Sequence, residues 1–275
     1  MKRPVELRRI PDPWVVLLDI EYSRAVRRAL AICALLGGGC GRLGFDARPD
    51  ARDDAHADAP FDASLGPPRV VQHASDSRPN AIAVSVALTA LVVAGDVLVV
   101  ATSTTADNGT PTVMDSQGDL YTLEVTDAQA GEAAVGLYVA TAQATAATTV
   151  TCRTGVVDNV HCHVYELAGT TGIVETTGMV VQVGPALTVS PASATTRDND
   201  YVLAFFVGNN SSATFTADPS YGDAEYTPSS SNDVAFSEGR LAPIGPQTAT
   251  ATAVSSGAVF VEVIAALAPA GAAAR

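Results

Sequence analysis

Basic residues are scarce in this sequence. Lysine occurs once, at Lys2, and the formal net charge of the 275 residues is −13. Residues 1–39 hold seven Lys and Arg against four Asp and Glu, so their removal would leave a net charge of −16. Nucleic-acid binding needs clustered Lys and Arg to neutralise phosphates. The composition therefore argues against nucleic acid as a partner.

Aromatic residues are also few, at 5% of the chain, and the single tryptophan is Trp14. Glycan-binding surfaces usually present exposed aromatic rings. From residue 69 onward tyrosines are the main candidates for such platforms, and we expect most of them to pack in a core instead: Tyr121, Tyr138, Tyr165, Tyr201, Tyr221 and Tyr226.

Recognisable catalytic motifs are missing. The sequence contains no nucleophile elbow, no metalloprotease helix and no phosphate-binding loop. His73, Ser75 and Asp76 lie close together in VQHASDS, but a catalytic triad is an arrangement in space and not in sequence. We therefore predict a protein that is not an enzyme, with no catalytic residue and no cofactor. A hydrolase with an unrecognised site stays as a secondary alternative.

The longest apolar run near the amino terminus, residues 29–36, is shorter than the roughly 20 residues of a membrane-spanning helix. Arg24, Arg27 and Arg28 precede it, and Gly37 to Gly39 then lead to Cys40. Basic, apolar and small residues in this order predict a secretion signal within residues 1–39. Residues 1–22 are too acidic for such a signal and indicate a start codon assigned too early.

Cys40 in this setting resembles the lipidation cysteine of bacterial lipoproteins, and the resemblance implies a lipid anchor at Cys40. A signal cleaved nearby or an uncleaved apolar helix are the alternatives. Residues 40–68 are rich in Asp, Ala and Pro and predict a disordered tether. This tether resembles those of myxobacteria-like lipoproteins. The expected location is the cell envelope, at the outer membrane or cell surface, with the membrane as partner through the anchor.

From residue 69 to residue 270 the pattern is that of strands, and residues 271–275 form a short tail. AIAVSVALT alternates apolar and small residues, whereas DVLVVAT and DYVLAFFV are continuous apolar runs. The first pattern is typical of half-buried strands and the second of central ones. The sequence therefore predicts an all-β fold, an antiparallel β-sandwich.

The two halves of this region resemble each other. Asp96 and Asp200 open similar apolar strands 104 residues apart, and Gly118-Asp119 precedes Gly222-Asp223 by the same distance. We predict a duplicated strand order. The apolar segment MVVQV between the halves favours one jelly-roll-like sandwich. Two tandem immunoglobulin-like sandwiches are the alternative.

Cys152 and Cys162 are predicted to form a disulfide, because the chain is expected outside the reducing cytosol. We read ATTVTCRT and VHCHVYEL as neighbouring strands joined by GVVDN, which would bring the two thiols together. Zinc bound by these cysteines with His161 and His163 is disfavoured, because alternation turns the histidines away from Cys162.

Metal binding elsewhere has weak support. Asp115 and Asp119 in DSQGD, and Asp223 in the second half, are weak calcium candidates. Asp, Ser and Gly are also the residues that tight turns require, and we favour a turn. No metal is predicted.

AGDVLVVATS, TVMDSQGDLYTL, AAVGLYVATAQATAATTVTC and VYELAG resemble a widespread bacterial and phage surface β-sandwich module. The resemblance covers most of residues 80–269 and implies a secreted sandwich without established catalytic residues. The expected function is a lipid-anchored structural or adhesive head, with a glycan or surface protein as candidate partner. A carbohydrate- or ligand-binding module is the alternative.

Overall fold

The computed structural model describes residues 66–104, 109–209, 213–228, 233–254 and 258–271. These ranges contain strands and turns and no helix, so the described part of the chain offers no helix that could cross a membrane. The predicted signal region, Cys40 and nearly all of the predicted tether lie outside the described residues.

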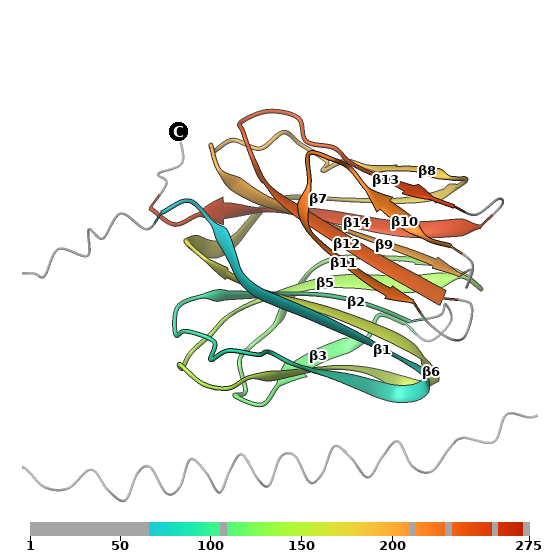
Figure 1. Ribbon diagram of the computed structural model, residues 1–275, viewed down its shortest axis with the longest axis horizontal. Helices are drawn as coiled ribbons and strands as arrows, with labels where there is room; N and C mark the ends of the chain where they lie inside the picture. The colour runs from blue at the N-terminus through green and yellow to red at the C-terminus, as the bar shows by residue number, and fades with distance from the viewer. Residues whose placement is uncertain (1–65, 105–108, 210–212, 229–232, 255–257, 272–275) are drawn as a thin grey trace, which may run out of the picture. The chain divides into compact units, whose positions relative to one another are not determined.

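The first half forms one six-stranded antiparallel sheet (Figure 1). Its strand order is β1-β6-β2-β5-β4, and β3 pairs with β6 off this path. The end of β1 pairs with the start of β6, the segment of β6 that also pairs with β3. The strands are β1 (Arg69–Ala87), β2 (Val97–Thr104), β3 (Thr112–Asp115), β4 (Thr122–Gln129), β5 (Ala133–Thr141) and β6 (Thr149–Ala168).

The second half repeats this strand order but divides it between two sheets. Its large sheet has the order β7-β14-β9-β12-β11 and its small sheet the order β8-β13-β10. The strands are β7 (Thr170–Val183), β8 (Ala186–Val189), β9 (Asp200–Asn209), β10 (Phe215–Ala217), β11 (Gly222–Pro228), β12 (Asp233–Ala242), β13 (Ala249–Ala253) and β14 (Val259–Pro269). The pair β7 and β8 takes the place of β1, and the pair β13 and β14 takes the place of β6.

Pairing registers give the equivalence residue by residue. Val97 pairs with Thr141 and Leu167, and Tyr201 pairs in the same way with Leu241 and Leu267. The predicted all-β fold, an antiparallel β-sandwich with a duplicated strand order, is confirmed.

One predicted correspondence within the duplication is wrong. Thr122 pairs with Val139, and Gly222 pairs with Gly239, the residue equivalent to Val139. Gly222 therefore corresponds to Thr122. The Gly-Asp echo lies before β4 in the first half but inside β11 in the second.

The described residues form three apolar clusters. One lies within the first half, one between the sheets of the second half, and one between the two large sheets. Val97 and Val99 of β2 face the shared cluster, whereas Leu98 and Val100 face the first. Because β2 and β9 are buried on both faces, their sequences are continuous apolar runs.

The start of β1 and the end of β14 both lie beside the connection between β6 and β7. Arg69 pairs with Ala168 at the start of β1, and Pro269 pairs with Thr170 at the end of β14. Gly169 lies between them with φ +78°, and a Cβ there would lie 2.6 Å from the carbonyl oxygen of Gly66. Glycine therefore allows both the turn and the close approach.

Candidate functional site

A buried polar cluster joins the two large sheets on one side of the shared core. Strand β6 supplies His161, His163 and Tyr165, which alternate with Cys162 and Val164 and so face the second half. Strands β11 and β12 supply Thr227 and Ser237. All five polar side chains are at least 94% buried. We call these five residues the junction.

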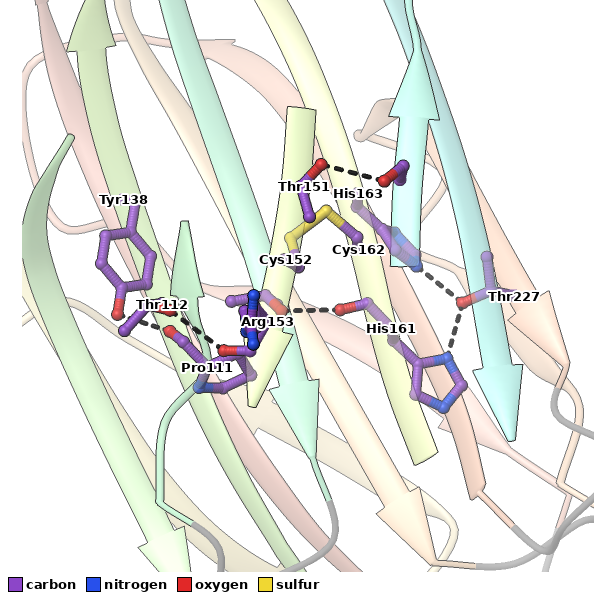
Figure 2. The surroundings of a disulfide bond; sticks show 12 residues. Pro111, Thr112, Tyr138, Thr151, Cys152, Arg153, His161, Cys162, His163 and Thr227 are labelled. Atoms are coloured by element: carbon purple, nitrogen blue, oxygen red, sulfur yellow. Dashed lines mark hydrogen bonds between the residues drawn. A yellow bond between two sulfur atoms is a disulfide. The ribbon is translucent and has the colours of Figure 1, made fainter. Parts of the chain in front are cut away.

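Hydrogen bonds connect the five junction residues, and Figure 2 shows the contacts of His161 and His163 with Thr227. The Nδ1 of His163 lies 2.7 Å from the Ser237 hydroxyl, and its Nε2 lies 2.8 Å from the Thr227 hydroxyl. Thr227 also meets His161 Nδ1 at 3.0 Å, and the Tyr165 hydroxyl lies 2.6 Å from that of Ser237. Burial lowers the pKa of His161 to about 4 and that of His163 well below its usual range. Both imidazoles are therefore neutral at neutral pH.

The candidate catalytic trio of VQHASDS does not form a triad. His73 Nδ1 lies 2.5 Å from Glu225 Oε1, and the Ser75 hydroxyl donates to Glu225 Oε2 at 2.7 Å. Both side chains therefore contact the carboxylate and no bond joins serine to histidine among the described contacts. Asp76 accepts a hydrogen bond from the backbone of Ser77. The His73 ring stacks on Tyr165 at the outer edge of the junction.

The junction residues can be compared with the residues at the equivalent positions in the other half of the chain. By register, His161, His163 and Tyr165 correspond to Val261, Val263 and Ala265. Ser237 corresponds to Leu137, and Glu225 to Val125. Thr227 corresponds to Asp127, so the contact between the large sheets is mainly apolar on one side and hydrogen-bonded on the other.

A groove of about 500 Å³ opens on the apolar side, between β4 and β7. Its lining combines hydroxyl groups, apolar side chains and one carboxyl, from Glu124, Val125, Thr126, Thr177, Gly178, Met179, Ser190 and Ala192. His73 and Glu225 occupy the corresponding place on the other side, where Thr177 and Val125 are their equivalents. The smaller side chains leave this side open.

The predicted disulfide between Cys152 and Cys162 is confirmed, with Cα atoms 5.9 Å apart. The predicted hairpin between them is wrong. Both cysteines lie on the single long strand β6, where Cys152 pairs with Val84 and Cys162 with Asp76 of β1. The bond joins the part of β6 that pairs with β3 to the part that pairs with β2, and it lies within the apolar cluster of the first half.

The weak calcium candidates lie in two separate segments. Asp115 and Asp119 lie at and just after the end of β3, and Asp223 lies in β11. Asp115 Oδ1 accepts the backbone N–H groups of Gln117, Gly118 and Asp119, and its Oδ2 accepts the Tyr121 hydroxyl. Asp223 is the second residue of β11 and accepts a hydrogen bond from the Tyr201 hydroxyl. Within the described ranges no three His, Cys, Asp or Glu side chains cluster as metal ligands.

Most of the candidate tyrosine platforms lie in the interior. Four are buried, namely Tyr138, Tyr165, Tyr201 and Tyr221. Tyr121 is half-buried, and Tyr226, with 37% of its surface exposed, donates to the carbonyl of Ala213. The tyrosines therefore do not form a shared platform on the described surface.

Sequence reasoning missed Glu225, Thr227 and Ser237. They lie 64 to 150 residues from their partners. A close comparison of the two halves would have been a usable signal, because Val125 and Leu137 are apolar at the positions where Glu225 and Ser237 are polar.

Glu238 and Glu262, two carboxyls buried in the second half, make stability depend on pH. Burial raises the pKa of Glu262 from 4.5 to about 8 and that of Glu238 to about 7. Between pH 4.5 and 8 the folded chain keeps a proton on Glu262 that the unfolded chain loses. The free energy of unfolding therefore falls as pH rises through this window. The junction histidines act oppositely, but only below about pH 6.5.

We expect Glu262→Gln to raise the free energy of unfolding at pH 8.5 by about 2 kcal/mol and to change it little at pH 5. Glutamine can still accept the hydrogen bond from Gln182 and carries no charge. Urea unfolding of both proteins at the two pH values measures the difference. Equal gains at both pH values would contradict ionisation of Glu262 as the cause.

Comparison of the chain with known protein families, curated proteins and solved structures finds no match.

Proposed function

We propose that the protein is a lipid-anchored structural or adhesive module of the bacterial cell envelope. Cys40 would carry the lipid, residues 40–68 would act as a spacer, and the double sandwich would be the head displayed outside the membrane. The combination of a signal-like segment, an acidic spacer and a β-sandwich supports this function.

The observation that carries the proposal is the way the two halves are joined. They share one apolar cluster, and the junction adds hydrogen bonds between β6 and the strands β11 and β12. A disulfide also crosses the first half. These features favour one rigid unit over two mobile domains, and a rigid unit suits a head that transmits or resists contact forces.

The anchor is tested by replacing Cys40 with serine. We expect the native protein in the membrane fraction, labelled by a fatty-acid analogue, and the Cys40→Ser protein in the soluble fraction without label. Cys33→Ser is the matched control, because Cys33 lies within the apolar run and should leave with the signal. An antibody against the head should label intact cells only when Cys40 is present. Unchanged membrane partitioning of Cys40→Ser would contradict the proposal.

A further inference from the structure

A β-bulge brings a carboxyl to the groove between β4 and β7. Glu124 lies in β4 at a register shift between Leu123 and Val125, which makes it the extra residue of the bulge. Neighbouring residues on a regular strand face opposite sides of the sheet, but Glu124 and Val125 both line the groove. The bulge therefore combines a carboxyl and an apolar side chain in one lining.

The second half has the bulge without the carboxyl. Strand β11 shows the same register shift, between Gly222 and Glu225, and Ala224 stands at the position of Glu124. The bulge therefore belongs to the fold and does not require a charged residue. The carboxyl of Glu124 needs an explanation of its own.

The Glu124 carboxyl has no positive partner among the described residues, because none of the described ion pairs includes it. Burial raises the pKa of Glu124 above its usual value, so the groove already removes water from this carboxyl. An opposite charge beside a carboxylate stabilises its ionised form. A cation in the groove would therefore offset the cost of this burial.

The rest of the lining suits a ligand with an apolar body and hydrogen-bond donors. Val125 and Met179 offer apolar contact, and a thioether packs favourably against an aromatic ring. Thr126, Thr177 and Ser190 supply hydroxyl groups that can accept hydrogen bonds from an ammonium group. The volume of about 500 Å³ lies in the range of small-molecule pockets.

The β7 wall of the groove is held in place by the segment that follows β8. The Ala192 N–H donates to the Thr177 carbonyl at 2.8 Å. A Cβ on Gly178 would lie 2.0 Å from the Ser190 carbonyl oxygen, so glycine permits the close approach of this segment. A wall fixed in this way needs little reordering to accept a ligand.

The other side of the shared core shows how the fold accommodates a nitrogen ring. There the equivalent space holds His73, whose Nδ1 lies 2.5 Å from a Glu225 carboxylate oxygen while its ring stacks on Tyr165. The equivalents of His73 and Glu225 at the groove are the smaller Thr177 and Val125. A flat ring with a nitrogen donor therefore fits between these sheet edges beside a carboxylate.

We propose that the groove between β4 and β7 binds a small organic cation, an amine or a ring nitrogen on a flat apolar body. The nitrogen donates to Glu124 and to the hydroxyl groups of the lining, and the apolar body contacts Val125 and Met179. The net charge of −13 attracts such a ligand and repels an anion of the same shape. This binding goes beyond the proposed structural role and does not depend on the lipid anchor.

The test uses the full-length Cys40→Ser chain with its methionines labelled at the methyl carbon for NMR, because Met179 is one of only three methionines and lines the groove. Titration with benzylamine should shift the Met179 signal with a Kd of about 1 mM. Met114, exposed on β3, is the internal control and should not shift. Benzyl alcohol, which has the same shape without the charge, should bind about 10-fold more weakly.

Glu124→Gln should weaken benzylamine binding by about 10-fold and leave benzyl alcohol binding unchanged. Glu132→Gln is the matched control, because it removes the same charge outside the groove lining. Thr177→His places the residue of the other side in the groove and should block both ligands. Thermal melts check that the three variants stay folded.

A Met179 signal that stays in place at benzylamine concentrations far above this Kd would overturn the proposal. Equal affinity for benzylamine and benzyl alcohol would overturn it as well, as would benzylamine binding that Glu124→Gln does not weaken. None of these outcomes bears on the lipid anchor, which is measured separately by membrane partitioning.

Discussion

Replacing His163 with valine is expected to lower the free energy of unfolding by about 3 kcal/mol. The imidazole bonds Ser237 through one nitrogen and Thr227 through the other, and it is fully buried. Valine removes both bonds, leaves two hydroxyl groups with one partner fewer, and opens a space between the sheets. Chemical unfolding at pH 7.5, where the histidines are neutral, gives the value directly.

The double variant His163→Val with Ser237→Leu should recover at least half of this loss. These two residues occur as Val263 and Leu137 on the apolar side of the shared core. Removing both partners of a buried hydrogen bond costs less than removing one. Tyr165 keeps its bond to the Asp223 carbonyl, and Thr227 keeps its bond to His161. A double variant less stable than the single one would contradict the equivalence of the two sides.

Loss of the Cys152–Cys162 bond is expected to cost a similar amount, about 3 kcal/mol by the chain-entropy account. The bond closes a short loop within β6, and both cysteines are fully buried. Since β6 stays paired with β1 and β2, the reduced protein should still fold. Its melting temperature should fall by roughly 10 °C.

The cleanest measurement compares the oxidised protein with protein that is unfolded, reduced and refolded in reductant. The double variant Cys152→Ala with Cys162→Ala is the control, because the same reductant should not change its melting temperature. Peptide mass spectrometry of the native protein should recover the cross-linked pair. Free thiols in protein isolated from the cell envelope would refute the bond.

Much of the fold follows from local patterns in the sequence. Alternation and continuous apolar runs identify the strands, because side chains on a strand face opposite sides and central strands are buried on both. The similarity of DVLVVAT and DYVLAFFV also predicts the repeated strand order. The pairing of Cys152 with Cys162 was predicted correctly, but through a hairpin that is absent, because no local signal shows that one strand runs through both cysteines.

These local patterns do not predict the candidate site. His73, His161 and His163 obtain their partners from the other half of the chain, and no spacing rule links His73 to Glu225. The strand identities alone do not show that two large sheets meet face to face. Only that meeting turns five polar residues, separated by up to 76 positions, into one junction.

The chain enters the sandwich beside Gly169, and this position determines how the fold responds to a pulling force. Residues preceding Arg69 lead directly into β1, which is the edge strand of its large sheet. A pull on this end would load the Arg69–Ala168 pair first and then open the bonds between β1 and β6 one pair after another. Such peeling needs less force than sliding two strands past each other. The resistance of the head to traction is therefore set by the first pairs of β1, which precede the pairs Ser75–His163 and Ser77–His161 along the same two strands.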